Sequence, residues 1–414
     1  MALLRRMNAP APAEQIRDRG SAASVQPAAR PRLSVIAALA AKPAGLVPLA
    51  SVSVPAWERL AAHAIEPNAC YWPAWALPVA AHARGRGDAL ALLATDRAAP
   101  DRLAGLLPVR WAGRALSLPV PLLVSWNAYA PCSVPLLDRD GAVEAASALI
   151  DAAKAAGARA LLLQSIATEG PAYAAILDSL THRGLTPRLM RSYRRAGLDA
   201  RGDAETVLRT ALSAKKLKEL RRQRNRLEDT GAVVFETITA PDRIGPALET
   251  FLALEAEGWK GVRGTALIQH DGDAAFIRAA APALAARGQF EVASLTRNGE
   301  TLASGLILRD GGRAWFFKIA MDETEARTSP GVQLTLDLTK HFCADAGVDF
   351  ADSSADGEHP MIDHLWRERI VIADVFVPLS PRDPFAAAIG ALVAARYRAI
   401  DFVRTLRRIR EKLP

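Results

Sequence analysis

The densest set of polar side chains in the sequence lies between residues 349 and 366, where carboxylates, hydroxyls and two histidines follow one another. Transfer of a group to an amine or a hydroxyl needs a base that takes the acceptor's proton, directly or through water. Asp352 and His359 are the leading candidates for that base, followed by Asp356 and then by His364. The run Asp-Ser-Ser-Ala-Asp-Gly is also ordinary turn and helix-cap chemistry, so a structural role stays open.

A turn upstream of this stretch has the composition of a phosphate site. It joins a predicted strand to a predicted helix, and the free N–H groups and positive dipole end of such a helix can hold a pyrophosphate. A helix that begins with a proline, here Pro330, is equally common without any ligand, so that alternative stays open. The predicted phosphate-binding residues are Arg327, Ser329, Gly331, Val332 and Gln333.

Composition narrows the classes of protein that these residues can belong to. A chain of 414 residues that is half hydrophobic and 23% charged has enough apolar sequence for two folded domains. Its net charge of +8 favours a polyanionic or phosphate-bearing partner. The cysteines Cys70, Cys132 and Cys343 are scattered, so we predict neither a disulfide framework nor a metal site.

No secretory signal and no membrane span is apparent in the sequence. The basic N-terminus is followed by Pro10, Pro12 and Glu14 instead of an apolar run, and later apolar runs fall short of the roughly 18–20 residues of a span. We therefore expect a cytoplasmic protein, with peripheral contact at the inner membrane as an option.

Helix and strand patterns alternate in the first half after a low-complexity arm. Glycines stop the predicted helices, which favours a layered α/β lobe. The predicted strands are Ala89–Thr95, Leu103–Trp111, Leu116–Val124, Ala158–Ile166 and Pro187–Leu198, and the predicted helices are Ala142–Ala156 and Pro171–Arg183.

The second half repeats the alternation with stronger signals. A helix over Ile244–Glu257 leads into a predicted loop, Gly258–Gly264. The turns at Asn298-Gly299 and at Asp310-Gly311-Gly312 predict an antiparallel meander of three strands. The elements expected after that meander are a helix Val332–Ala346, strands Val348–Ala351 and Ile370–Val377, and a last helix Phe385–Lys412.

Meander, glycine turn, helix, strand, helix and strand is the element order of GNAT acyltransferases. The string from Leu254 to Gly261, the strand Trp315–Asp322 and the Ser-Pro-Gly turn resemble the acetyltransferases of cellulose and exopolysaccharide synthesis (the CelD type), as do Glu66-Pro67-Asn68 and residues 135–138 in the first half. The turn departs from the usual GNAT pattern, because it has one glycine, displaced by a residue, with a proline where the first glycine belongs.

This resemblance implies a fold of two tandem GNAT-like lobes, α/β with a mixed sheet and helices on both faces. The implied organisation is a disordered arm (1–31), a structural N-terminal lobe (32–200), a basic linker helix (203–230), an acyltransferase lobe (231–380) and a basic amphipathic C-terminal helix (384–414). The implied activity is transfer of an acyl group from acetyl-CoA or another acyl-CoA to an amine or a saccharide hydroxyl. Polysaccharide or cell-envelope synthesis is the setting that the resemblance suggests for it.

The resemblance also assigns residues over the acceptor cleft. Glu255 would act as a base or hold an acceptor amine, Trp259 would offer an apolar wall, and Lys260 lies beside them. Lys318 sits in an apolar strand, where an ammonium needs a carboxylate partner or an anionic ligand. Pairing of Glu255 with an arginine and packing of Trp259 between the lobes are the alternatives.

Two rival functions stay open. Tandem lobes also resemble the FemAB transferases, which use aminoacyl-tRNA, and the basic linker helix would then contact the tRNA phosphates. No aromatic residue lies between Tyr193 and Phe235 to stack a base, so other nucleic-acid binding is not expected. The second rival is a non-catalytic component of a polysaccharide-synthesis complex. The linker helix could also simply be a solvated face, and the last helix could lie on an anionic membrane or pack its apolar stripe on the lobe or on a partner subunit.

Overall fold

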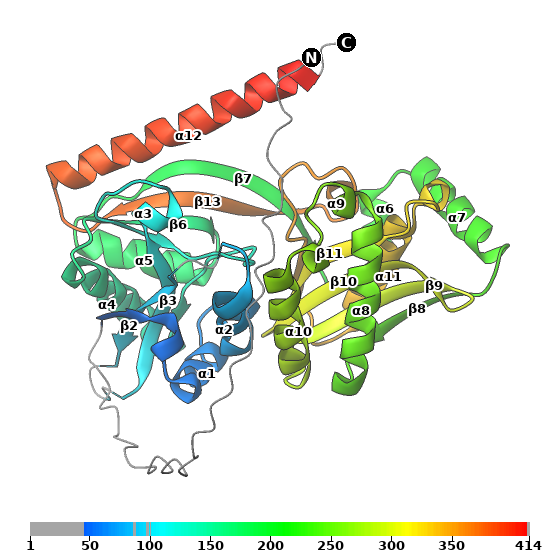
Figure 1. The fold of residues 1–414 in the computed structure, drawn as a ribbon, viewed down its shortest axis with the longest axis horizontal. Coiled ribbons are helices and arrows are strands. Elements are labelled where there is room, and N and C mark those ends of the chain that lie inside the picture. Colours follow the sequence, from blue (N-terminus) through cyan, green and yellow to red (C-terminus); the bar gives the residue numbers. More distant parts are fainter. Residues whose placement is uncertain (1–44, 86–87, 97–98, 100, 412–414) are drawn as a thin grey trace, which may run out of the picture. The chain divides into compact units, whose positions relative to one another are not determined.

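The computed structural model describes residues 45–85, 88–96, 99 and 101–411. The predicted arm, residues 1–31, lies outside this range. The described residues belong to one compact unit. In this unit thirteen strands form one mixed sheet, with helices on both of its faces (Figure 1).

The first half of the chain supplies the strands up to β7. The prediction of a strand over Leu116–Val124 was too long, because Ser117 has a left-handed φ of 55° and two prolines that cannot donate to a ladder precede Leu122. The elements are β1 Gly45–Pro48, α1 Val54–Ala62, α2 Pro73–His82, β2 Leu90–Thr95, β3 Leu103–Trp111, α3 Ala112–Ala115, β4 Leu122–Ser125, β5 Leu136–Leu137, α4 Ala142–Ala155, β6 Ala160–Ala167, α5 Pro171–His182 and β7 Arg188–Asp199.

The second half begins with two helices where one basic helix was expected. Leu212 is extended between them, and the Ser213 hydroxyl accepts from the Lys216 amide to start the second one. The elements are α6 Ala204–Ala211, α7 Ala214–Glu228, β8 Val233–Ile238, α8 Pro241–Glu257, α9 Trp259–Val262, α10 Asp271–Ala285, β9 Phe290–Arg297, β10 Glu300–Asp310, β11 Arg313–Met321, α11 Pro330–Ala344, β12 Phe350–Asp352, β13 Glu368–Pro378 and α12 Pro384–Glu411.

The predicted meander is confirmed. Strands β9, β10 and β11 pair antiparallel in sequence order. Both turns contain successive residues with positive φ, Asn298 (52°) with Gly299 (85°) and Gly311 (49°) with Gly312 (80°). Asparagine and glycine tolerate that conformation, which matches the right-handed twist of the strands that they join.

The two halves of the chain form one continuous sheet, because strands of each half pair with strands of the other. The strand order across the junction is β4-β6-β13-β7-β12-β11. The last strand, β13, therefore pairs with β6 and β7 of the first half, and β7 pairs in turn with β12 of the second half. Figure 1 shows β7 and β13 running side by side.

Alternate side chains of β9 and β10 enter two different cores. Phe290, Val292 and Leu306 pack in one core with residues of α8 and α10. Leu295 and Ile307 pack in another core with residues of α11. This period of two places α8 and α10 on one face of the meander and α11 on the other.

The Glu66-Pro67-Asn68 string of the first half contacts the β10–β11 turn of the second half. The Asn68 amide and the Trp72 indole N–H donate to Asp310 Oδ2 at 3.1 and 2.9 Å, and Arg313 Nη1 lies 3.4 Å from Glu66 Oε1. These contacts give the string a structural role in joining the halves. Among the described helices, none combines the length and the apolarity that a bilayer span requires.

Candidate functional site

Strands β11 and β12 are parallel neighbours along three residue pairs, Arg313–Trp315 with Phe350–Asp352. There β12 ends, whereas β11 continues to Met321, so within the described residues no strand pairs with the rest of β11 on that side. A pocket of about 790 Å³ opens where the two strands separate. Its walls are residues 316–321 of β11, residues 353–356 and 359–362 after β12, and residues of α8 and α9.

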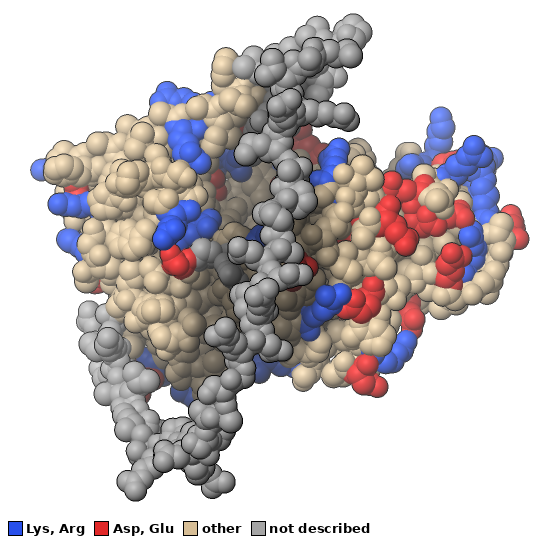
Figure 2. All heavy atoms as spheres, in the orientation of Figure 1, with Lys and Arg blue, Asp and Glu red and all other residues tan. Residues whose placement is uncertain are grey.

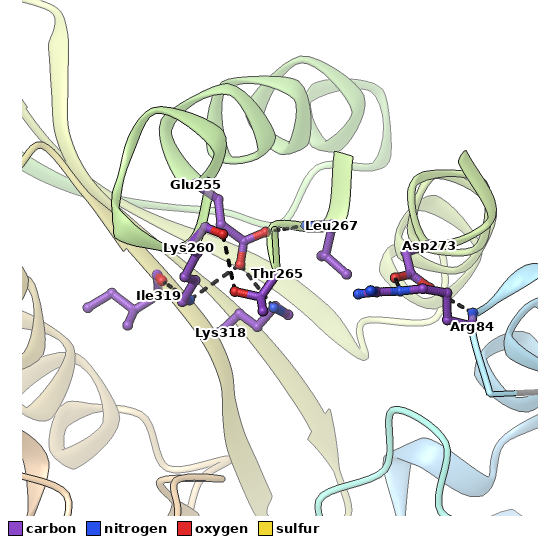
Figure 3. Close-up of polar contacts among 8 residues, drawn as sticks. All are labelled: Arg84, Glu255, Lys260, Thr265, Leu267, Asp273, Lys318 and Ile319. Carbon is purple, nitrogen blue, oxygen red and sulfur yellow. Dashed lines mark hydrogen bonds and ion pairs between the residues drawn. The ribbon is translucent and has the colours of Figure 1, made fainter. Parts of the chain in front are cut away.

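A β-bulge interrupts β11 inside the pocket wall. Leu306 pairs with Lys318 and Ile307 pairs with Phe316, which leaves Phe317 as the extra residue. Bulges bend a strand and change the direction of its side chains, and they are frequent next to functional sites. In this protein the Lys318 side chain extends from β11 toward α8 (Figure 3).

Glu255 of α8 holds two lysines inside the pocket. Its Oε1 atom accepts from Lys318 Nζ at 2.9 Å and from Lys260 Nζ at 3.3 Å, while Oε2 accepts from the Leu267 amide at 2.8 Å (Figure 3). The Glu255 side chain is fully buried, and each lysine side chain is 18% exposed. Because both carboxylate oxygens already have N–H donors, the geometry favours Glu255 as the group that positions the lysines and argues against it as the base.

Lys260 is tied to β11 as well as to Glu255. Its Nζ atom donates to the Ile319 carbonyl at 2.6 Å, and the Thr265 amide donates to the Lys260 carbonyl at 2.8 Å. Burial lowers the pKa of Lys260, the charge of Lys318 lowers it further, and Glu255 opposes both. The sequence predicted that Lys318 needs a carboxylate partner or an anionic ligand, and that partner is the Glu255 carboxylate, which Lys260 also contacts.

The pocket mouth carries an aromatic residue beside a guanidinium. Trp259 is 45% exposed, so it does not pack between the halves. The Arg263 guanidinium lies 4.9 Å from the centroid of the Trp259 ring, and Glu323 Oε1 accepts from the Trp259 amide at 2.6 Å. The loop predicted over Gly258–Gly264 contains the short helix α9, which sets Trp259 and Lys260 at the pocket.

Of the bases predicted in the segment 349–366, Asp356 and His359 line the pocket. They belong to a loop in which Ser354 and Glu358 have positive φ values of 54° and 62°, a conformation that costs energy for non-glycine residues. The Met361 amide donates to His359 Nδ1 at 3.4 Å. In the neutral ring that contact places the proton on Nε2.

Asp352 and His364, a leading and the last candidate for the base, are not among the residues that line the pocket. Asp352 is buried and forms an ion pair with Arg195 of β7. His364 is exposed at the end of a 3-10 turn, Ile362–His364. The geometry therefore argues against Asp352 as the base, because its charge is already neutralised away from the pocket.

The predicted phosphate turn adjoins the pocket without lining it. A Cβ atom on Gly331 would come within 2.8 Å of Met321 Sδ and 3.6 Å of Met361 Sδ, and both methionines line the pocket. Arg327 is exposed. Ser329 has a left-handed φ of 53° and precedes Pro330, the first residue of α11.

Two of the expected amide donors already have partners within the turn. The Val332 and Gln333 amides donate to the Ser329 carbonyl at 2.9 and 3.1 Å. The Gln333 side chain is buried and donates to the Leu220 carbonyl of α7 at 2.9 Å. The geometry thus gives Gln333 a part in docking the basic helix, and leaves Gly331 as the backbone group closest to the pocket.

Sequence reasoning missed two charged residues of this region. Arg195, which neutralises Asp352, lies in a strand with three other arginines, Arg188, Arg191 and Arg194, so no local signal distinguishes it as the buried one. Arg263 lies in the stretch expected to be a loop, where no periodic signal marks it.

Comparison with known proteins bears on the same part of the chain. Residues 214–359 match the model of the Acetyltransferase (GNAT) domain, which indicates transferase activity and includes the residues that line the pocket up to His359. No curated protein matches the chain. The CelD-type resemblance therefore stays a prediction.

Solved structures resemble most of the chain at low sequence identity. FemX has a TM-score of 0.52 at 12% identity, with 79% of this chain and 96% of that chain covered. A conserved protein of unknown function from Bacteroides thetaiotaomicron VPI-5482 has a TM-score of 0.50 at 14% identity, with 79% and 98% covered. A tandem GNAT protein from the clavulanic acid biosynthesis pathway has a TM-score of 0.41 at 16% identity, with 82% and 99% covered. The predicted α/β fold with a mixed sheet and helices on both faces is confirmed, and it resembles the fold of FemX.

Proposed function

We propose that this protein is an acyltransferase that uses acetyl-CoA or another acyl-CoA and acts in the pocket between β11 and β12. The observation that carries the proposal is the separation of two parallel strands beside a helix start, within residues that match a GNAT domain. A separated pair leaves backbone groups of β11 free to hold an extended chain in the gap. The start of α11, near Gly331, would contact the pyrophosphate.

The chemistry proposed for the pocket is direct attack on the thioester. An amine or hydroxyl of the acceptor attacks the thioester carbonyl, the C–S bond breaks, and the thiol leaves with a proton. Asp356 is the preferred base, because the Met361 contact directs the neutral His359 ring to donate through Nε2. None of the three cysteines is among the residues that line the pocket, which favours direct transfer over a cysteine intermediate.

Calorimetric titration of acetyl-CoA tests the cofactor. We expect binding in the micromolar range for the wild-type protein, and loss of binding in Gly331→Asp, which would place a negative charge against Met321. Gly331 is buried, so its replacement by Asp can also disturb the fold, and two further variants test the same binding. Ala355→Phe fills the pocket from the loop that follows β12, and Arg327→Glu reverses a charge at the exposed end of the turn and leaves the core intact. Both should weaken the binding of acetyl-CoA. No binding by the wild-type protein would reject acyl-CoA as the donor.

The FemAB-like alternative keeps one observation in its favour. Helix α7 docks through Leu220 and Leu227 and carries a run of exposed cations, and Figure 2 shows blue side chains gathered at that end of the molecule. Retardation of aminoacyl-tRNA by the wild-type protein, lost after charge reversal on α7, would favour this alternative over acyl-CoA. The exposed cations are Lys215, Lys216, Lys218, Arg221, Arg222 and Arg226.

A further inference from the structure

The charges do not balance within the cluster that Glu255 forms with Lys260 and Lys318; Glu323 and Asp356, the other carboxylates that line the pocket, lie outside this cluster. Glu255 supplies one negative charge to two ammonium groups, and both ammonium groups contact the same oxygen, Oε1. A single lysine would satisfy the buried carboxylate, so the second ammonium is in excess. Two like charges that share one oxygen repel each other, and burial makes that repulsion stronger.

The excess charge faces the pocket. Both Lys260 and Lys318 line it, and both side chains are 18% exposed. Lys318 Nζ donates to Glu255, and Lys260 Nζ donates to Glu255 and to the Ile319 carbonyl. An ammonium has three N–H donors, so hydrogen-bonding capacity beyond these contacts remains for a ligand.

We propose that the acceptor carries its own carboxylate, and that Lys318 and Lys260 bind this carboxylate. The proposal rests on the function proposed above and names the class of acceptor for the same pocket. A carboxylate has one charge and two oxygens, which matches one excess positive charge on two neighbouring donors. A phosphate dianion would instead leave a negative charge unbalanced.

The position of the cluster assigns the carboxylate to the acceptor instead of the acyl chain. Glu255 and Lys260 belong to α8 and α9, the wall opposite the loop that follows β12, and Lys318 extends toward α8 (Figure 3). The acyl-CoA is proposed to lie in the gap between β11 and β12. Asp356 lines the pocket from the loop that follows β12, where it can take the proton of the acceptor's amine. Trp259 and Arg263 at the mouth would cover the acceptor's body.

The first test reads the two lysines directly and needs no turnover. An amine-reactive acetylating reagent labels the protein, and mass spectrometry gives the extent of labelling at each lysine. The probes are 3-phenylpropionate and its neutral isostere 3-phenylpropionamide, which differ in the carboxylate. We expect 3-phenylpropionate to protect Lys260 and Lys318 several-fold and the amide to protect neither. Lys340, an exposed lysine of α11 that pairs with Asp337, is the internal control and should label equally throughout.

The second test measures specificity by release of the CoA thiol. L-phenylalanine and L-phenylalaninamide carry the same amine and differ in the carboxylate. In Lys318→Met we expect KM for the acid to rise by about 10-fold to 100-fold, the loss expected for a charge-assisted hydrogen bond, with KM for the amide unchanged. Lys340→Met is the matched control.

The source of the carboxylate is tested with butyryl-CoA and succinyl-CoA, which have acyl chains of equal length. Equal effects of Lys318→Met on the binding of the two compounds are expected. A selective loss of succinyl-CoA binding would assign the carboxylate to the acyl group and overturn the acceptor assignment. Equal protection by the acid and the amide, or unchanged protection of Lys260 in Lys318→Met, would overturn the proposal even where acetyl-CoA still binds. Failure of acetyl-CoA to bind would reject the proposed function and leave the labelling result to be judged by itself.

Discussion

Arg195 of β7 and Asp352 of β12 form an ion pair whose side chains are 2% and 3% exposed, although 157 residues separate them along the chain. Arg195 Nη1 also donates to the Pro131 carbonyl at 2.7 Å, and Asp352 Oδ1 accepts from the Ser354 amide at 2.8 Å. The pair therefore connects the first half of the chain to the loop that carries Asp356 and His359.

Replacement of Asp352 by Asn should destabilise the protein strongly. The substitution leaves the buried guanidinium without a counter-charge, and removal of one partner from a buried pair typically costs about 3–5 kcal/mol. Urea unfolding at neutral pH measures the loss. The double variant Arg195→Met/Asp352→Leu should recover most of it, because no buried charge remains. An Asp352→Asn protein with unchanged stability and abolished transfer would instead restore Asp352 as the base.

Asp310 should make stability depend on pH. Burial raises the pKa of the Asp310 carboxyl, and its N–H donors from Trp72, Asn68 and Gln289 oppose that shift without cancelling it. The folded protein then binds this proton more tightly than the unfolded chain does, so the stability that the group contributes is present at low pH and is lost as pH rises through the folded pKa.

The variant Asp310→Asn removes this titration while it keeps an acceptor for Trp72. Gln289 Nε2 now donates to Asp310 Oδ1, and a turn of the Gln289 amide group would let its Oε1 atom, a buried oxygen without a hydrogen-bond partner in the described structure, accept from the new side-chain amide at position 310. We expect the free energy of unfolding of the variant, relative to wild type, to increase from about pH 4 toward neutral pH. Urea titrations across that range measure the difference. A difference that is constant with pH would contradict the prediction, and Asp310→Ala, which leaves three donors without this acceptor, should lose about 2 kcal/mol or more.

Glu255→Gln should unbalance the pocket. Gln can still accept from the Leu267 amide, but two ammonium groups then lack any negative partner at this position. We expect a stability loss of about 2–4 kcal/mol, and recovery of part of it in Glu255→Gln/Lys318→Met. Denaturant unfolding of the single and double variants measures both effects. Equal losses in the single and the double variant would show that repulsion between the lysines is not the cause.

Ser329→Gly should stabilise the turn before α11. Ser329 has a φ of 53°, and its side chain makes no capping hydrogen bond, so glycine relieves strain without loss of a contact. An increase of about 0.5–1 kcal/mol in the free energy of unfolding is expected. Ser117→Gly, at a φ of 55° remote from the pocket, should give a similar increase. A decrease at Ser329 alone would indicate that its hydroxyl has a role that the described contacts do not include.

Local signals in the sequence predicted the local structure well. The Asn298-Gly299 turn and the glycines after Asp310 can adopt the backbone that their hairpins need, so the meander followed from short-range chemistry. The prediction of one continuous linker helix was wrong at Ser213, because the hydrophobic period does not distinguish an internal serine from a helix-capping serine.

Contacts between distant residues set the limits of prediction in the site. The sequence marked Lys318 as a cation in need of a partner, but the partner, Glu255, was expected to act as a base. Asp352 was placed in the pocket because its neighbours in sequence are polar, whereas Arg195, brought beside it by the pairing of β12 with β7, neutralises it. Strand pairing across more than a hundred residues has no local signature.

The place of β13 between β6 and β7 has a consequence for the order in which this chain can assemble on the ribosome. Strand β7 ends at Asp199, but the neighbour that belongs between it and β6 begins at Glu368. During synthesis the N-terminal half must therefore wait, with one edge of β6 and both edges of β7 without their partners, until nearly the whole described chain has emerged. Fragments cut in the linker at Gly202 should for the same reason assemble as a complementing pair, each incomplete without a strand from the other.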